Sequence, residues 1–318
     1  MASKCTMVLD TDVGTDDAVA LLMALSQPSV DLIGVTCVHG NTSLDNVLVN
    51  TLRVLKLCNR LDVPVYKGTA CPLISSNKRT DASFTHGSDG MGGIPDPHPP
   101  SRDLIQSEHA VNALIRMANE HPGEISLVAI GPLTNLALAT KMDPEFSKKL
   151  KELVIMGGNI EGRGNRPGAE FNFFVDPEAA YITLQEYTCP ITVVPWDTCV
   201  RNGLTWEWYD QWTSTDTVKG HFVRDILKRG MTNARTFYKR HLAPIFDPLT
   251  MAVVINRSIV SETKRSPVLV EVKGDVTRGQ MVQVDASFVD HPKNGREVDI
   301  VLKCDADGIK EMLMKAVE

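Results

Sequence analysis

The chain has 318 residues, of which 43% are hydrophobic, and it carries a formal net charge of −6. This length supplies a large core, and α/β chains of this size often fold as one domain. No Lys/Arg-rich run is present, so nucleic acid is not expected as a partner. Seven scattered cysteines without a C-x-x-C pair indicate reduced thiols. Neither a signal-like N-terminus nor a run of about 18 apolar residues is present, so we expect a cytoplasmic protein that does not enter membranes.

Short apolar runs alternate with longer amphipathic segments through the first two thirds of the chain. The expected strands are residues 7–9, 32–37, 63–66, 125–130, 153–156 and 191–194. The expected helices between them are residues 16–26, 44–58, 108–120, 133–140 and 177–185. Each spacing allows a β-α-β crossover. The pattern therefore predicts an α/β fold with an open, mostly parallel sheet and helices on both faces.

The last third of the chain has a different pattern. Residues 206–256 are predicted to be largely helical, with a break near residues 241–244. The tail is predicted to return to strands at 268–273 and 298–303, followed by a helix from Asp305.

Residues 75–103 are rich in Ser, Gly, Pro and Asp, which predicts a long loop. Long loops in compact domains are often functional. No segment has the composition of a linker between domains, so we expect a single domain over residues 1–318.

A crowded group of carboxylates lies between the first predicted strand and the first predicted helix, in the stretch VLDTDVGTDDAVALLMAL (8–25). Its four aspartates fall within eight residues and are Asp10, Asp12, Asp16 and Asp17. Like charges this close raise each other's pKa and cost free energy unless something neutralises them. In an open parallel sheet, ligands bind beyond the carboxyl ends of the strands, which is where this group is expected.

A capped helix start accounts for part of this group. Gly14 permits a tight turn, Thr15 is expected to cap the helix, and Asp16 and Asp17 occupy its first turn, where the helix dipole favours negative charge. This interpretation explains two of the four aspartates. A hard cation that prefers carboxylate and carbonyl oxygens would use the rest.

Two other cation-binding patterns fit less well. In an EF-hand counted from Asp10, the glycine would fall at Thr15 and the bidentate glutamate at Leu21, so that motif fails. Phosphatases of the haloacid-dehalogenase type also begin with Asp-x-Asp after a first strand. Here Val13 interrupts their usual continuation, and we keep that class as an alternative.

The segment DTDVGTDDAVAL (10–21) resembles the N-terminal signature of the inosine–uridine-preferring nucleoside hydrolases. Five further segments resemble that family in the same order: HGN (39–41), THGSDGMGG (85–93), AIGPLTNLALA (129–139), MGGNIEGRGNRPGAEFNFFVDPEAA (156–180) and FDPLTMAVVI (246–255). Each piece alone is modest, and their combination, from residue 8 to residue 256, is specific.

The resemblance implies a single α/β domain with a Rossmann-like core and a bound Ca²⁺. It also implies hydrolysis of the N-glycosidic bond of ribonucleosides such as uridine or inosine, by a homodimer or homotetramer. The implied metal ligands are Asp12, Asp17, Asp247 and the carbonyl oxygen of Ile130. Asp10 would support the loop, and Asp12 would also accept the proton of the attacking water.

The remaining implied residues contact the substrate. They are Asp16, Asn41, Met156, Asn165, Glu170, Asn172 and Asp247 around the ribose, and His86 beside the base. One departure is visible, because the segment between Asn165 and Glu170 is one residue shorter than the family's usual pattern.

The main departure concerns the acid that protonates the leaving base. Many members of the family have His immediately before the final Asp, whereas this chain has Phe246, which has no proton to donate. Tyr238 and His241 are the candidates to replace it. If neither does, the chain is a catalytically weak, Ca²⁺-dependent nucleoside-binding protein. The preferred base stays open.

Overall fold

The computed structural model describes residues 4–74, 82–285 and 295–318. These residues form a ten-stranded sheet in the order β4-β3-β2-β1-β5-β6-β7-β10-β8-β9. The strands are β1 Cys5–Thr11, β2 Val30–Cys37, β3 Val65–Lys67, β4 Ile105–Gln106, β5 Ser126–Ala129, β6 Glu152–Met156, β7 Ile191–Val194, β8 Val260–Val270, β9 Met281–Gln283 and β10 Arg296–Cys304. Strands β1 to β7 run parallel to one another, and β10 is parallel to β7. The antiparallel pairs among these ten strands are β10 with β8 and β8 with β9, so the predicted mostly parallel sheet is confirmed.

Helices connect the strands in the predicted α/β alternation. They are α1 Thr15–Ser26, α2 Leu44–Leu57, α3 Ser83–His86, α4 Ala110–Glu120, α5 Thr134–Met142, α6 Phe171–Val175, α7 Pro177–Glu186, α8 Trp196–Arg201, α9 Trp206–Thr213, α10 Val218–Thr232, α11 Asp247–Ile255 and α12 Ala306–Val317. A short π-helical segment, Asn233–Phe237, continues α10. None of the helices in the described part of the chain is long and apolar enough to cross a membrane.

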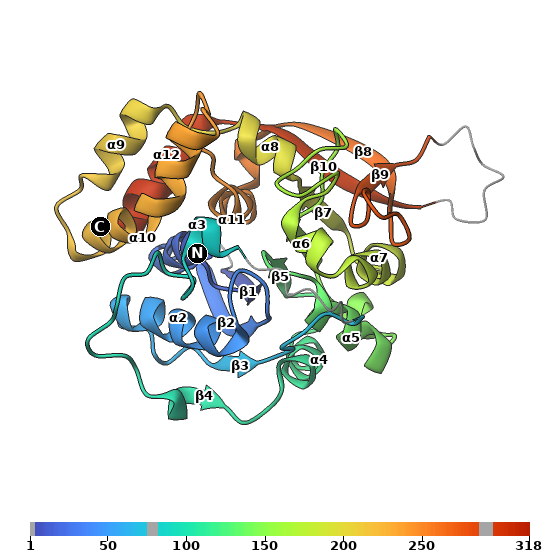
Figure 1. Ribbon diagram of the computed structural model, residues 1–318. Helices are drawn as coiled ribbons and strands as arrows, with labels where there is room; N and C mark the ends of the chain where they lie inside the picture. The colour runs from blue at the N-terminus through green and yellow to red at the C-terminus, as the bar shows by residue number, and fades with distance from the viewer. Residues whose placement is uncertain (1–3, 75–81, 286–294) are drawn as a thin grey trace.

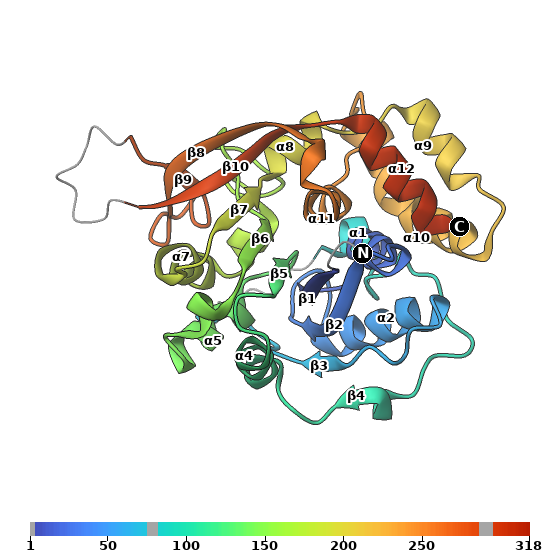
Figure 2. The ribbon, with the colours of Figure 1, turned by 180° about the vertical axis from the view of Figure 1, so that it is seen from behind.

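Helices cover both faces of the sheet, as predicted. One buried apolar cluster lies between the sheet and helices that include α1, α2, α10, α11 and α12. A second cluster lies on the opposite face, beneath α4, α5 and α7. Figures 1 and 2 show α10, α11 and α12 gathered on one side of the molecule and α4, α5 and α7 on the other. Central parallel strands are covered on both faces, and accordingly every residue of β5 and β7 is buried, with no alternation between buried and exposed positions.

The direction in which strands are added to the sheet changes at β1. The chain first adds β2, β3 and β4 on one side of β1, and later adds β5, β6 and β7 on the other side. The carboxyl ends of β1 and β5 therefore flank the point where the winding direction changes, and ligands of such sheets bind at that point. The acidic segment follows β1 directly.

Several predicted boundaries were wrong. The strand predicted at 268–273 is β8, which begins earlier and ends at Val270, because its first half is an exposed polar segment that pairs with β10. The short strands β4 and β9 were not predicted, since two or three residues carry no periodic signal. Of the predicted loop 75–103, residues 75–81 lie outside the described part, and the remainder contains α3.

Candidate active site

The turn between β1 and α1 is closely packed. A Cβ on Gly14 would lie 2.6 Å from Nδ1 of His86 and 2.8 Å from Nδ2 of Asn41. The φ angle of Gly14 is −97°, so this glycine provides space rather than a left-handed turn. The predicted cap was wrong. Gly14 precedes the helix and Thr15 is its first residue, while the Asp17 carboxylate accepts the Gly14 N–H at 2.9 Å.

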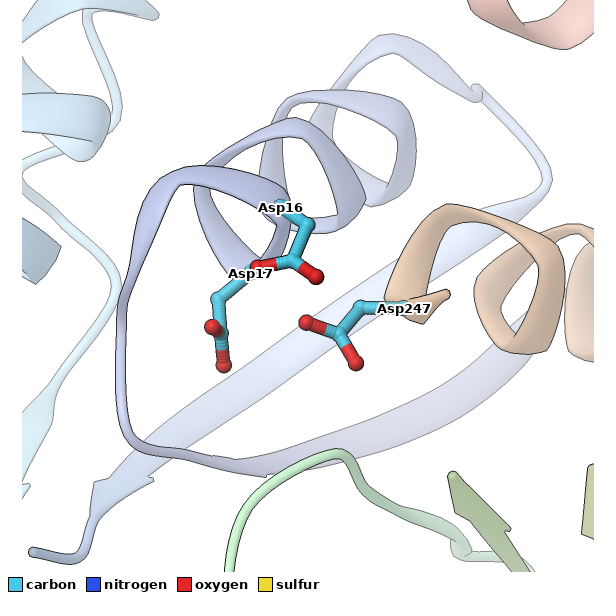
Figure 3. A group of neighbouring side chains, drawn as sticks. All are labelled: Asp16, Asp17 and Asp247. Carbon is cyan, nitrogen blue, oxygen red and sulfur yellow. The ribbon is translucent and has the colours of Figure 1, made fainter. Parts of the chain in front are cut away.

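Three carboxylates from two distant segments meet beside this turn. Oxygen atoms of Asp16, Asp17 and Asp247 all lie within 4.8 Å of one another. Figure 3 shows Asp16 and Asp17 on the first turn of α1, facing Asp247 at the start of α11. The N-termini of both helices point at this group, where their dipoles favour negative charge. We call Asp12, Asp16, Asp17 and Asp247 the acidic cluster, because the Asp12 carboxylate interacts electrostatically with these three.

The pKa values show that the acidic cluster is short of positive charge. Burial raises the pKa of Asp12, Asp17 and Asp247, and repulsion from the neighbouring carboxylates raises each further. Burial also raises the pKa of Asp16 to about 6. Among the described residues, no lysine or arginine forms an ion pair with these carboxylates. A metal cation fits the all-oxygen group, because it would offset this repulsion.

His86 does not supply the missing charge. Its Nδ1 accepts the backbone N–H of Thr15 at 3.1 Å and lies 3.6 Å from Oδ1 of Asp16. Burial lowers the pKa of His86 to about 4, so the ring is neutral at pH 7. Because Nδ1 is an acceptor, the single ring proton of the neutral form lies on Nε2.

One carboxylate oxygen of Asp12 accepts a hydrogen bond, and the other has no hydrogen-bond partner among the described residues. Oδ2 accepts the backbone N–H of Asn41 at 2.7 Å. Oδ1 is buried and has no hydrogen-bond partner among the described residues. The Asn41 side chain donates to Asp17 at 2.9 Å, and Thr11 donates to the other Asp17 oxygen at 2.7 Å. Asn41 therefore positions two of the carboxylates.

Asp10 lies behind the acidic cluster and ties three elements together. It is fully buried in β1, and Oδ2 accepts hydrogen bonds from Thr36 in β2 at 2.6 Å and Asn135 in α5 at 2.8 Å. Burial raises its pKa to about 7. These contacts join β1 to β2 and α5.

Glu170 and Asn172 form a second group of polar side chains, which we call the polar wall. The Glu170 carboxylate caps α6 by accepting the N–H groups of Asn172, Phe173 and Gly158 at 2.7, 3.2 and 3.0 Å. Burial raises its pKa to about 7. Asn172 Nδ2 donates to the carbonyl oxygens of Ile130 at 2.9 Å and Met156 at 3.1 Å. The carboxyl ends of β5 and β6 are thereby joined to α6.

Several of these side chains line one cavity of about 410 Å³. Of the predicted site residues, it is lined by Asp16, Asn41, His86, Ile130, Met156, Asn165, Glu170, Asn172, Tyr238 and Asp247. Phe246 also lines it, and Tyr238 lies at an exposed position. His241 is exposed and is not among the lining residues. Asp12 and Asp17 are not among its lining residues.

The sequence analysis missed several lining residues, including Arg166, Trp196 and Arg240. Trp196 follows the end of β7, so its place at the carboxyl edge of the sheet was a usable signal. Arg240 lies in an irregular segment between α10 and α11, where no local pattern shows which side chains turn inward.

Comparisons with known proteins identify the family of this chain. The model of the family "Inosine-uridine preferring nucleoside hydrolase" matches residues 7–311. The chain belongs to this nucleoside hydrolase family. It is similar to the inosine-uridine preferring nucleoside hydrolase of Leishmania major, at 34% identity over 98% of this chain and 97% of that one. It is also similar to a probable uridine nucleosidase 2 of Arabidopsis thaliana, at 41% identity over 59% of this chain and 57% of that one.

Solved nucleoside hydrolase structures share the fold. A plant nucleoside hydrolase, the PpNRh1 enzyme, superposes with a TM-score of 0.90 at 30% identity, over 98% of both chains. The chain is thus an enzyme of the nucleoside hydrolase family. The family match favours the nucleoside hydrolase prediction over the phosphatase alternative.

Proposed function

We propose that this nucleoside hydrolase uses Ca²⁺ to hydrolyse ribonucleosides of the uridine or inosine type to free base and ribose. One observation carries the proposal: Asp16 and Asp247 of the acidic cluster line a cavity of about 410 Å³, and no lysine or arginine in the described part of the chain forms an ion pair with the cluster.

The proposed ligands are the predicted set of Asp12, Asp17, Asp247 and the Ile130 carbonyl. We add Asp16 to this set of ligands, because its carboxylate oxygen lies within 4.8 Å of those of Asp17 and Asp247. Carboxylate and carbonyl oxygens are the ligands that Ca²⁺ prefers. When bound, the cation would offset the carboxylate repulsion and lower the pKa of a neighbouring water.

The proposed general base is Asp12. Its Oδ2 is held by the Asn41 N–H, which leaves Oδ1 to accept a proton. Water adds to C1′ as the C1′–N bond breaks, the water proton passes to Oδ1, and the electron pair of the broken bond leaves with the base. The reaction needs no further reactant.

The proposed ribose site is the polar wall together with the cavity-facing carboxylates of Asp16 and Asp247. Glu170 and Asn172 are held by backbone groups on several sides, so they are placed before substrate arrives. Met156 lies beside Asn172, and Asn165 completes this side of the cavity lining. A site that pairs with each sugar hydroxyl disfavours a sugar that lacks one.

The proposed leaving-base site includes His86 and Tyr238. Tyr238 lines the cavity, so it is the better placed of the two candidate acids. His241 could serve only after its segment moves, as active-site segments of enzymes often do. His86 can offer its Nε2 proton as a hydrogen bond to the base, because its Nδ1 already accepts the Thr15 N–H.

The decisive experiment measures ribose release from uridine, inosine, adenosine, guanosine and cytidine, before and after a chelator. We expect turnover of at least one nucleoside, its loss on chelation, and its recovery when Ca²⁺ rather than Mg²⁺ is restored. Release of ribose from none of the five would overturn the proposed activity. Full turnover by a protein shown to be metal-free would overturn the Ca²⁺ dependence.

Three broader predictions remain. The seven free cysteines suit a reducing compartment, and we propose a cytoplasmic location. We also propose a single domain, which predicts one cooperative unfolding transition, and a homodimer or homotetramer, which sedimentation would identify.

A further inference from the structure

We propose that Arg240 determines base specificity by binding a carbonyl oxygen of the departing base, and so favours oxo bases such as hypoxanthine and uracil over amino bases such as adenine. This inference rests on the proposed function and adds a residue that the sequence analysis did not identify. It also gives this chain a way to stabilise the leaving base, although Phe246 stands where many members of the family have a histidine.

Arg240 is held at the cavity by an aromatic residue. Its guanidinium carbon lies 5.0 Å from the ring centroid of Trp196, and both residues line the cavity. Trp196 begins α8 directly after β7 and is only 8% exposed. A cation over an indole face is attracted by the ring quadrupole, so the guanidinium has a defined place at the carboxyl edge of the sheet.

The backbone around Arg240 is fixed from both sides. Its N–H donates to the Ala234 carbonyl at 2.9 Å, and its carbonyl accepts the Trp206 indole N–H at 2.9 Å. The preceding residue, Lys239, has a φ of 48°, which turns the chain sharply between Tyr238 and Arg240. Arg240 is therefore placed in advance, and donors placed in advance contribute most to stabilising charge that develops during a reaction.

The Arg240 charge is available to a ligand. Among the described residues, no carboxylate forms an ion pair with its guanidinium, although the cavity is lined by Asp16, Glu170 and Asp247. Burial and the neighbouring Arg163 lower its pKa, yet a guanidinium remains protonated at every working pH. Arginine has five N–H donors and no acceptor, so it donates to a carbonyl oxygen and cannot accept a hydrogen bond from an exocyclic amino group.

The reaction creates a charge that suits this group. When the C1′–N bond breaks, its electron pair passes to the base, and in hypoxanthine or uracil the negative charge is shared with a carbonyl oxygen. Arg240 stabilises this developing charge without giving up a proton, and Tyr238 is the candidate that donates a proton to the base as it leaves. Phe246, which lines the same cavity, offers neither a proton nor a hydrogen bond.

Arg235 provides a matched control in the same segment. Its guanidinium carbon lies 4.3 Å from the Trp206 ring centroid, so it makes the same kind of cation–π contact as Arg240. Unlike Arg240, it is exposed, donates to both oxygens of Asp210 at 2.9 and 2.8 Å, and does not line the cavity.

The test compares Arg240→Met with Arg235→Met in the Ca²⁺-loaded enzyme, on inosine and adenosine, whose bases differ in the 6-oxo and 6-amino groups. We expect Arg240→Met to lower kcat/KM for inosine by about 10²–10³-fold, the usual scale for losing one stabilising donor. The loss for adenosine should be much smaller, and Arg235→Met should leave both unchanged. Arg240→Lys keeps the charge without the planar fork and should recover part of the inosine rate.

Equal losses of kcat/KM for inosine and adenosine in Arg240→Met, or no loss for either, would overturn the inference. Thermal unfolding of each variant shows whether the substitution has only destabilised the protein. If the wild-type enzyme hydrolyses neither nucleoside, the proposed function fails separately. Calorimetric binding then tests Arg240: a wild-type preference for inosine that Arg240→Met abolishes supports the role, and an unchanged preference or no preference overturns it.

Discussion

At the scale of single residues, Asp12 shows how one carboxylate can have two roles. Asparagine at this position can still accept the Asn41 N–H through its amide oxygen, but its amide nitrogen cannot accept a proton. We predict that Asp12→Asn lowers kcat by about 10²–10⁴-fold while part of the nucleoside binding is retained. Metal content must be measured on the same sample. A metal-replete variant with near-normal kcat would remove Asp12 from the role of base.

Tyr238 and His241 differ in position, and this difference leads to a second prediction. Tyr238 lines the cavity, although 54% of it is exposed, whereas His241 lies outside the lining. A general acid matters most when the leaving group is poor. Its loss should therefore slow the hydrolysis of uridine or inosine by about 10²–10⁴-fold. Hydrolysis of p-nitrophenyl riboside should be spared, because p-nitrophenolate leaves as a stabilised anion. We expect this pattern for Tyr238→Phe rather than His241→Ala. Equal slowing of both substrates, or no effect, would exclude the residue tested.

At the scale of secondary-structure elements, the short helix α6 depends on one side chain. Glu170 accepts three backbone N–H groups and so holds the helix start that carries Asn172. We predict that Glu170→Ala lowers the free energy of unfolding by about 0.5–2 kcal/mol, the usual range for a lost cap. It should also raise KM for nucleosides, because Asn172 loses its fixed position.

Ser43→Ala is the matched control for this prediction. Ser43 caps α2 by accepting the Asn46 N–H, and no residue of α2 lines the cavity. It should reduce stability without changing KM. An unchanged KM in Glu170→Ala would show that the cap does not position the ribose site.

At the scale of the whole molecule, the buried carboxylates couple stability to pH. Burial raises the pKa of Asp12, Asp17 and Asp247, and that of Asp16 to about 6. Between the ordinary pKa and the raised one, the folded chain binds protons that the unfolded chain has already released. The free energy of unfolding of the metal-free protein therefore falls as pH rises through this range.

The resulting prediction concerns chelated and Ca²⁺-loaded protein. Without metal, Tm should fall as pH rises from about 4, the ordinary pKa of an aspartate, through about 6, the raised pKa of Asp16, and Ca²⁺ should remove most of that fall by taking the place of the protons. The metal should therefore raise Tm more at the upper end of this range. Thermal scans of both forms across the range test this, and a metal-free Tm that rises with pH would show that the buried carboxylates do not control the pH dependence.

Local patterns in the sequence predicted the elements that depend on local chemistry. The apolar run around β1 and the dense aspartates after it identified the carboxyl edge of a strand, because buried strands and charged turns differ sharply in composition. The order of motifs also indicated the family, which the family match confirmed. Boundaries at β8 were less predictable, since half of that strand is polar and is held by pairing with β10.

Only the tertiary structure determined which side chains meet. Local sequence placed Asp16 and Asp17 next to each other, and Asp247 was assigned to the same site only through the family resemblance; the structure shows that Asp247, from α11, lies against both. No signal in the sequence indicated that Arg240 lies over Trp196, which directly follows β7 and is far from Arg240 along the chain. The physical reason is that strand order and helix packing bring these segments together across the sheet, and neither is encoded in the local periodicity of the segments themselves.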